Sequence, residues 1–330
     1  MKKKMLGIMM MAALAATSIG AVTAHAEATS EAPGEGLKVL VGASNMSGSF
    51  YSWLANSCAE ECEKLGMEAD IFDFESDSAN VANLFEQAVV GEYNGVIIDI
   101  PDQDLPMEDL LKDAQENDVW VVFVNNATPA DGYSVHVGLD NLTLGKNIGA
   151  VAAERIPENG KGLIMKATPG NTGSEDRYDG FVQALEEAGR DDVEVIAVQN
   201  SKDWSKEGAM AVMEDWTQLY DEFDFVYAPC DDMAVGCIEV CEAAGYDTQA
   251  IQFYGIDGLA NGCNAVKEGT MTATILQNAT DEAVASAQAV LEMATGVDTE
   301  SKLIALDGTV VDLENVDDIM AMHEANGMLK

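Results

Sequence analysis

The chain has 330 residues, of which 58 are acidic and 17 are Lys or Arg, and its formal net charge is −41 at pH 7. This charge argues against nucleic acid and anionic membrane surfaces as partners, since both are negatively charged themselves. A chain of this length is too long for one average domain and suits two, each large enough to bury a core.

The first 26 residues have the pattern of a secretory signal peptide. Lys2, Lys3 and Lys4 precede the apolar run "MLGIMMMAALAA", and "AHA" at residues 24–26 provides small residues for cleavage. The apolar run is shorter than the ~20 residues that a membrane-spanning helix needs. We therefore expect residues 1–26 to be removed on export to the periplasm or the outer face of a bacterial cell. The loss of three lysines takes the formal charge from −41 to −44.

Residues 27–36 are expected to form a flexible leader. After the leader, short apolar runs alternate with amphipathic stretches, which is typical of parallel βαβ units. The first series ends near Asp140, where we expect the chain to cross to a second, similarly wound lobe. The expected strands of the first series are residues 37–43, 68–74, 95–100 and 119–124, with helical patterns at 53–66 and 80–91, and those of the second series are residues 162–167, 193–199, 225–228, 251–256 and 272–276.

Open parallel sheets bind ligands at the carboxyl ends of their strands. The side chains that follow the expected strands include aromatic rings, amides, carboxylates and one guanidinium. Carboxylates accept hydrogen bonds, Arg donates them in a fixed fork and amides do both, while aromatic rings cover apolar faces. This set suits a polyhydroxylated ring, which has hydroxyls at its edge and C–H groups on its faces. The candidate site residues are Phe50, Tyr51, Asn125, Asn126, Arg177, Trp204, Cys230, Asp231, Asp257 and Gln277.

The segment "ATPGNTGSEDRYDGF" at residues 167–181 allows three interpretations. A phosphate cradle requires the Lys-Ser/Thr ending of a P-loop, which is missing here, and acidic residues stand where the phosphate would lie. In the second interpretation, Arg177 forms only a surface pair with neighbouring acids, an arrangement that stabilises little. In the third, Arg177 binds the hydroxyls of an uncharged ligand, which agrees with its position after an expected strand.

Two of the acidic and aromatic candidates also have plainer structural interpretations. Asp231 and Asp232 suit an N-cap of the helical pattern that follows better than a pair of catalytic carboxylates, because adjacent side chains project differently. Trp204 is either a core residue or a ligand-facing ring. Its polar neighbours in "NSKDWSKEG" favour the ligand-facing ring.

The remaining aromatic and amide candidates have similar alternatives. Asn125 and Asn126 precede Pro129 and could belong to a turn. Of Phe50 and Tyr51, we expect one to be a core contact in the first turn of a helix.

The six cysteines include two pairs with a spacing of four residues. An exported protein can oxidise its thiols, but residues four apart lie on one helix face at a separation ill suited to a disulfide. No histidine sits beside these pairs, which argues against zinc. We therefore expect buried thiols, no metal and no cofactor. The pairs are Cys58 with Cys62 and Cys237 with Cys241, and Cys230 and Cys263 stand alone.

Three segments carry a family resemblance: "RYDGFVQALEEAG", "DDMAVGCIEVCEAAG" and "YGIDGLANGCNAVKEGTMTATILQNA". They resemble the corresponding segments of periplasmic sugar-binding proteins of ATP-binding-cassette (ABC) transporters, of the ribose and galactose/glucose type. The resemblance covers essentially the whole mature chain. It implies the α/β fold of a type I periplasmic binding protein, in which two Rossmann-like lobes with parallel sheets are joined by a three-strand hinge. The implied lobes are residues 37–140 with 278–305, and residues 141–277 with 306–330.

The resemblance also implies roles for the candidate residues. Asp231 would support the site rather than touch the ligand. Cys230 departs from the family pattern, because the usual residue there is Asn, and it leaves the identity of the sugar or polyol open. In the implied site, Phe50 or Tyr51 and Trp204 sandwich the ring, Arg177 and Asp257 hold hydroxyls, and Asn125 and Gln277 complete the polar set.

The implied function is capture of a monosaccharide or polyol by a monomeric protein that delivers it to the membrane permease of an ABC importer. A receptor module that passes a sugar signal to a membrane sensor is the alternative. An enzyme is less well supported. After the signal peptide only His136 and His323 remain, and neither a Gly-x-Ser-x-Gly nor a His-Glu-x-x-His motif is present.

Overall fold

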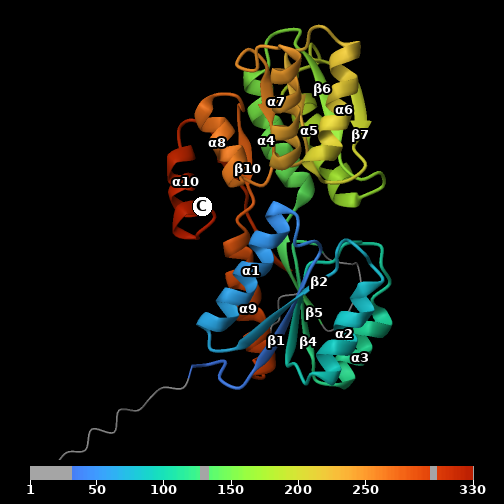
Figure 1. Cartoon of the computed structure of the whole chain (residues 1–330), viewed down its shortest axis with the longest axis vertical. Coiled ribbons are helices and arrows are strands. Elements are labelled where there is room, and N and C mark those ends of the chain that lie inside the picture. Colours follow the sequence, from blue (N-terminus) through green and yellow to red (C-terminus); the bar gives the residue numbers. More distant parts are fainter. Residues whose placement is uncertain (1–31, 127–133, 298–302, 330) are drawn as a thin grey trace, which may run out of the picture. The chain divides into compact units, whose positions relative to one another are not determined.

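Figure 1 shows the computed structural model of the chain, which describes residues 32–126, 134–297 and 303–329. The expected signal peptide and residues 27–31 of the expected leader lie outside the described residues. Residues 32–36 of that leader form turns, in which the amide of the buried Gly34 donates to the Leu65 carbonyl at 2.9 Å. This hydrogen bond anchors a part of the chain for which the sequence predicts flexibility.

The first sheet contains six parallel strands in the order β11-β5-β4-β3-β1-β2. Successive side chains of a strand point to opposite faces. Leu40 accordingly belongs to one buried cluster, and its neighbours Val39 and Val41 belong to another. Helices α1 and α9 cover one face and α2 and α3 the other (Figure 1). The bounds are β1 (Lys38–Ala43), β2 (Glu68–Asp73), β3 (Gly95–Ile98), β4 (Trp120–Val124), β5 (Ser134–Leu139), β11 (Leu303–Leu306), α1 (Ser49–Lys64), α2 (Asn80–Val90), α3 (Glu108–Glu116) and α9 (Ala279–Ala294).

The second sheet contains four parallel strands in the order β7-β6-β8-β9. Alternation along β6 again separates two clusters. Leu163 and Met165 pack with residues of α6 and α7, and Ile164 packs with residues of α4 and α5. The bounds are β6 (Lys161–Lys166), β7 (Glu194–Asn200), β8 (Phe225–Tyr227), β9 (Gln252–Tyr254), α4 (Asn141–Arg155), α5 (Thr172–Glu187), α6 (Lys206–Leu219) and α7 (Asp231–Ala244).

Four further elements lie beside the second sheet. Strand β10 (Thr274–Leu276) pairs antiparallel with β12 (Thr309–Val311), and helix α8 (Ala260–Glu268) contacts α10 (Val316–Ala325). A parallel bridge between Asp257 and Leu276 continues the order of the second sheet into β10. The carboxyl end of β10 therefore lies beside Asp257, which follows β9.

The chain passes between the two sheets three times: after β5, after β10 and after β11. The prediction of an α/β fold with parallel sheets in two lobes is thus confirmed. The lobe boundaries predicted at residues 140, 277 and 305 fall close to these passages, the last of them inside β11. The extent of each lobe stays a prediction.

Helices α4 and α5 pack backbone to backbone. A Cβ atom on Gly145 would lie 2.1 Å from the carbonyl oxygen of Arg177, and one on Gly180 would lie 2.2 Å from that of Leu142. Glycine is therefore required at both positions for the helices to approach this closely. The contact brings the Arg177 backbone to α4, at whose first turn Asn141 stands.

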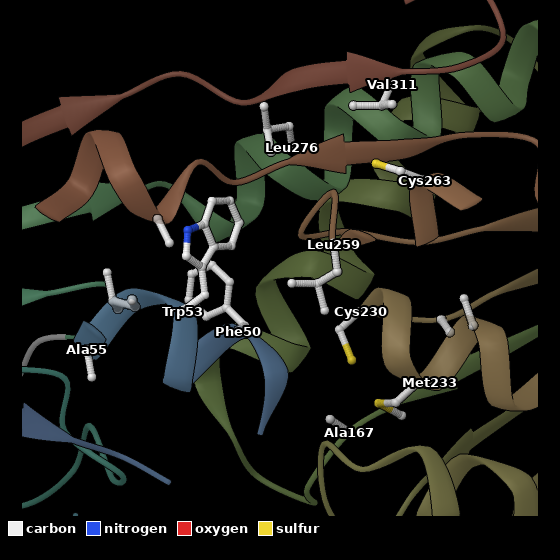
Figure 2. Packing of buried hydrophobic residues seen from close by; sticks show 14 of the residues in the cluster. Phe50, Trp53, Ala55, Ala167, Cys230, Met233, Leu259, Cys263, Leu276 and Val311 are labelled. Carbon is white, nitrogen blue, oxygen red and sulfur yellow. The ribbon is translucent and has the colours of Figure 1, made fainter. Parts of the chain in front are cut away.

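One buried cluster extends from α1 to the elements beside the second sheet. Figure 2 shows Phe50 and Trp53 of α1 in the same cluster as Leu276 of β10. The indole N–H of Trp53 donates to the Thr280 hydroxyl at 3.2 Å, and its ring meets the His323 ring edge-on at 5.1 Å between centroids. Apolar packing therefore connects α1 with the C-terminal helix α10.

All six cysteines are buried and free, which confirms the prediction of buried thiols. Burial raises the pKa of Cys62 to about 12, so this thiol is protonated at neutral pH. Within the part of the chain that the structure describes, no helix is long and apolar enough to cross a membrane.

Candidate functional site

A cavity of about 690 Å³ lies at the carboxyl ends of strands from both sheets. Of the ten residues predicted for the site, eight line it, and Asp231 and Gln277 do not. Its wall combines aromatic, amide and charged side chains. The eight are Phe50, Tyr51, Asn125, Asn126, Arg177, Trp204, Cys230 and Asp257.

Arg177 is the centre of the polar half of the cavity. Its side chain is nearly buried, yet four of its five N–H groups have acceptors on different segments. The Nε atom donates to Asn141 Oδ1 at 2.7 Å, and Nη1 donates to the Pro229 carbonyl at 2.8 Å and to Asp257 Oδ1 at 3.1 Å. The Nη2 atom donates to Gln277 Oε1 at 2.8 Å. One Nη2 proton has no acceptor among the described residues.

These contacts decide between the interpretations of the loop at 167–181. The surface-pair interpretation of Arg177 is wrong, because its ionic partner is the buried Asp257 and not a neighbouring acid of the same helix. Glu175, two residues before it on the same helix, pairs with Lys166 instead, at 2.7 Å. Asn171 caps α5 by accepting a hydrogen bond from the Ser174 amide at 3.0 Å.

Trp204 lies over the guanidinium. Its ring centroid is 5.4 Å from Arg177 Cζ, a distance at which a cation and an indole face attract each other. The side chain is half-buried and lines the cavity, so Trp204 is not a fully buried core residue. The Cys230 thiol faces the Trp204 carbonyl at 3.8 Å and is kept protonated by its own burial, which raises its pKa well above the usual range.

Phe50 and Tyr51 form the aromatic wall on the α1 side. Their rings meet edge-on with centroids 6.2 Å apart. Phe50 is buried and belongs to the core cluster, whereas Tyr51 is half-buried, and both line the cavity. The expectation that one of the two is a core contact therefore applies to Phe50. Burial and the nearby Asp99 raise the pKa of the Tyr51 phenol, which stays protonated.

Asp257 is held in a backbone conformation that is unfavourable for residues with a side chain. Its φ angle is 110°, a region that favours glycine. The Asp257 amide donates to the Ile275 carbonyl at 2.8 Å, and its own carbonyl accepts from the Gln277 amide at 3.1 Å. These bonds aim the carboxylate at Arg177. Burial raises the Asp257 pKa to about 7, against the lowering effect of the guanidinium.

Gln277 lies behind the cavity wall and connects the two sides of the site. Its Oε1 accepts from Arg177, while its Nε2 donates to Asn125 Oδ1 at 2.9 Å and to Glu282 Oε1 at 3.0 Å. Asn125 in turn donates to Asp99 Oδ1 at 3.2 Å. A chain of hydrogen bonds thus runs from the end of β3 to Arg177.

Asp231 is not the N-cap of α7, although the sequence predicts a capping role for it. The N-cap of α7 is Cys230, whose side chain makes no capping bond, so the prediction of an Asp cap is wrong. The Asp231 carboxylate is fully buried, accepting from the Leu259 amide at 2.7 Å and from the Thr274 hydroxyl at 2.6 Å. The carboxylate joins three segments behind the site, because hydrogen bonds from two donors that are distant in the sequence stabilise it more than a local helix cap would.

The Asn126 side chain accepts from Gln103 Nε2 at 2.7 Å, at the rim of the cavity. No group of three or more His, Cys, Asp or Glu side chains with the geometry of a metal site occurs in residues 32–126, 134–297 and 303–329.

Comparison with known proteins assigns the family. A profile of the periplasmic binding protein domain matches residues 39–298, which is more than half of the chain. The chain belongs to this family.

Relatives in the family show what the chain is similar to. A ribose import binding protein of Salmonella typhimurium (strain LT2) is 26% identical over 264 residues, which cover 79% of this chain and 86% of the relative. A xylitol-binding protein of Mycolicibacterium smegmatis is 28% identical over 211 residues, which cover 64% of this chain and 58% of the relative. Members of the periplasmic binding protein family bind solutes, and the names of these two relatives specify a sugar and a polyol.

A solved structure shows the same fold. The periplasmic solute-binding protein of an ABC transporter from Actinobacillus succinogenes, with bound D-allose, has a TM-score of 0.80 and 20% identity, and the match covers 86% of this chain and 99% of that one. The chain, with parallel sheets in two α/β lobes, therefore has the fold of a type I periplasmic binding protein.

Three residues of the site escaped the sequence analysis. Asp99 directly follows β3 and fits the rule for residues at strand ends, but in the sequence it lies inside the apolar run at 95–100. Asn141 begins α4 at the crossing point and accepts from Arg177. Glu282 lies on the buried face of α9, one turn from Ser286, so helical periodicity was the only signal for its burial.

Proposed function

We propose that this protein captures a monosaccharide or related polyol outside the cytoplasm and delivers it to an ABC importer, without catalysis and without a cofactor. The observation that carries the proposal is the pairing of Arg177 and Asp257 beside three aromatic side chains in one cavity. The relatives that bind ribose and xylitol by name support the same class of ligand.

The polar half of the cavity matches the chemistry of hydroxyl groups. A hydroxyl both donates and accepts, so it can accept from the free N–H of Arg177 and donate to a carboxylate oxygen of Asp257. The Arg177 charge is already paired with Asp257. The pair therefore suits an uncharged ligand better than a phosphate or a carboxylate, which would add a second negative charge.

Closure of the two lobes is the proposed mechanism. The cavity wall comes from the strand ends of both sheets, so a ligand makes all of its contacts only when both lobes approach it. The ligand then shifts the population from open to closed forms. We propose that the permease recognises the closed monomer.

A thermal-shift screen of monosaccharides and polyols tests the function. A ligand at a hundred times its Kd stabilises the folded state by about 2.7 kcal/mol, and each kcal/mol raises the melting temperature of a domain of 150–250 residues by about 2 to 4 °C. We therefore expect at least one neutral sugar or polyol to raise the melting temperature by several degrees. Sugar phosphates at the same concentration serve as the control. A screen in which only charged ligands stabilise the protein would contradict the proposal.

Replacement of Trp204 tests the aromatic part of the site. If the ring covers an apolar face of the ligand, Trp204→Phe keeps a π-face and changes affinity little, whereas Trp204→Ala removes a contact worth about 0.5 to 1.5 kcal/mol in addition to its buried area. We expect the affinity order wild type, Phe, Ala by calorimetry. Tryptophan emission should also change on titration of the wild type with the ligand from the screen.

The other tryptophans provide the control for this fluorescence experiment. Trp53 and Trp216 are buried, and Trp120 stands at the amino end of β4, the end opposite to the cavity. The emission change should therefore be lost in Trp204→Phe. If Trp204→Ala lowers only the melting temperature and keeps the affinity, the ring does not belong to the site.

A further inference from the structure

Buried carboxyl groups outnumber buried cations around the cavity. Four acidic side chains are almost inaccessible: Asp99 is 3% exposed, Asp257 6%, and Asp231 and Glu282 0%. Among the described residues, Arg177 is the one buried Lys or Arg side chain. A carboxylate without a cation is costly to bury, and such a group takes up a proton instead. A single guanidinium cannot compensate four carboxylates.

The hydrogen bonds show which of the four acids lack a cation or a full set of hydrogen-bond donors. Asp257 is paired with Arg177, and both oxygens of Asp231 accept hydrogen bonds. Asp99 and Glu282 each have one buried oxygen without a hydrogen-bond partner among the residues that the structure describes, Oδ2 and Oε2 respectively. The Ser286 hydroxyl, one turn after Glu282 on α9, is also buried and has no hydrogen-bond partner in residues 32–126, 134–297 and 303–329.

Glu282 is the acid best placed to affect the site. It contacts Gln277, and the same Gln277 amide bonds Asn125 of the first lobe and Arg177 of the second. We propose that Glu282 is a proton-binding site, that it is protonated in the folded protein at neutral pH, and that through Gln277 it makes ligand capture depend on pH. The last part rests on the proposed function, whereas the first two parts do not.

The surroundings of Glu282 favour the neutral form. Its pKa is raised to about 8, mainly by burial and further by Asp99 and Asp257, against the lowering effects of the Gln277 hydrogen bond and Arg177. From α1, the thiol of Cys58 also faces it and is itself protonated, because burial raises the Cys58 pKa well above the usual range. The neighbouring acid on α9, Asp281, is exposed.

The sign of the pH effect follows from this burial. The pKa of Glu282 is near 4.5 in the unfolded chain and about 8 in the folded one, so the folded state binds a proton that the unfolded state has lost between these values. The stability that the Glu282 proton contributes is therefore fully present below pH 4.5 and decreases as the pH rises from 4.5 to about 8. Glu282 is a positioning residue, and its ionisation favours forms in which water reaches Gln277. These forms do not hold Arg177 and Asn125 together, so affinity should decrease above pH 8.

Urea unfolding of the ligand-free protein between pH 5 and pH 9 tests the proton site. For Glu282→Gln we expect the unfolding constant, relative to wild type, to change by close to tenfold for each pH unit between pH 5 and about pH 7, because one proton fewer is linked to folding, and to level off above pH 8. Asp281→Asn, which removes an exposed charge from the same helix, should follow the wild type. A Glu282→Gln profile parallel to the wild type would overturn the proposal.

Two measurements on the wild-type protein keep the proposal testable if Glu282→Gln does not fold. In a carbon-13 NMR titration of glutamate-labelled protein, one carboxyl should titrate near pH 8, and a titration with every midpoint below pH 6 would overturn the proposal. Unfolding in sodium chloride and in choline chloride at equal ionic strength should give the same stability. A strong preference for sodium would show that a cation, and not a proton, occupies the site.

The affinity for D-ribose and xylitol at pH 7 and pH 9 tests the link to ligand capture. Kd should increase about tenfold in the wild type, since only about a tenth of the molecules keep the proton one pH unit above the pKa, and it should change far less in Glu282→Gln. Equal pH dependence in both proteins would remove Glu282 from ligand capture. If neither these probes nor any compound of the screen binds, the proposed function fails, while the ligand-free measurements still decide the proton site.

Discussion

Arg177→Ala is expected to weaken ligand binding by about ten- to a hundredfold. The free Nη2 proton of Arg177 is available for one charge-assisted hydrogen bond to the ligand, and such a bond contributes roughly 1.5 to 3 kcal/mol. At about 1.4 kcal/mol for each factor of ten, this loss gives the range stated. The variant also leaves Asp257 without its cation and Gln277 Oε1 without its donor.

The same substitution should destabilise the folded protein. Removing one partner of a buried ion pair costs about 3 to 5 kcal/mol, and we expect the lower end, because Asp257 lines a cavity and can take up a proton or bind water there. Arg177→Lys keeps the charge but not the five-donor fork, so it should lie between wild type and Ala.

Calorimetry with the ligand from the screen measures the affinity, and urea unfolding measures the stability. Arg190→Ala is the matched control. Arg190 also bonds an aspartate, Asp192 at 2.9 Å, but it does not line the cavity. Its replacement should therefore leave affinity unchanged. Unaltered affinity in Arg177→Ala would sink the proposed role of the guanidinium.

Asp231→Ala is expected to have the second largest effect, on stability. The Leu259 amide and the Thr274 hydroxyl both donate to the Asp231 carboxylate in a fully buried place. A buried donor that loses its acceptor costs roughly 1 to 3 kcal/mol. The hydroxyl can rotate to another acceptor, but the amide cannot. We therefore expect a loss of about 1 to 3 kcal/mol in urea unfolding, the range for one buried donor without an acceptor.

Asp231→Asn provides the informative comparison. An Asn oxygen can accept from the Leu259 amide while its NH₂ group donates to the Thr274 oxygen, so this variant should keep most of the stability. Asp232→Ala controls for the loss of an acid at the start of α7, since Asp232 bonds only Asn261, at 2.6 Å, among the described residues. Equal losses for Asp231→Ala and Asp232→Ala would contradict the assignment.

The sequence predicted most strands of both sheets because local periodicity indicates them, but β5, β11 and β12 fall outside the expected runs. Each apolar run of the two series overlaps a strand, and the parallel ladders follow from the βαβ connections. The rule that sites lie at the carboxyl ends of strands placed Arg177, Trp204 and Asp257 at one cavity. No contact between distant segments was needed for either inference.

The parts that the sequence missed depend on tertiary partners. Asp231 was assigned as a helix cap from its neighbours, but its partners Leu259 and Thr274 are 28 and 43 residues away. Glu282 is an acidic residue of the kind that usually lies on an exposed helix surface. Only the packing of α9 against the sheet shows that it is buried. Local propensity is a weak guide where distant donors compete for a side chain.

The backbone contact between α4 and α5 has a consequence for protein engineering. Since Gly145 and Gly180 meet carbonyl oxygens directly, this contact holds the Arg177 backbone close to α4. Thr168 and Asn126 line the cavity without bonding the guanidinium or meeting these glycines, so we expect a library at these two positions to leave the contact between α4 and α5 unchanged. A biosensor with altered selectivity should start from those two positions, and the glycine pair should stay as it is.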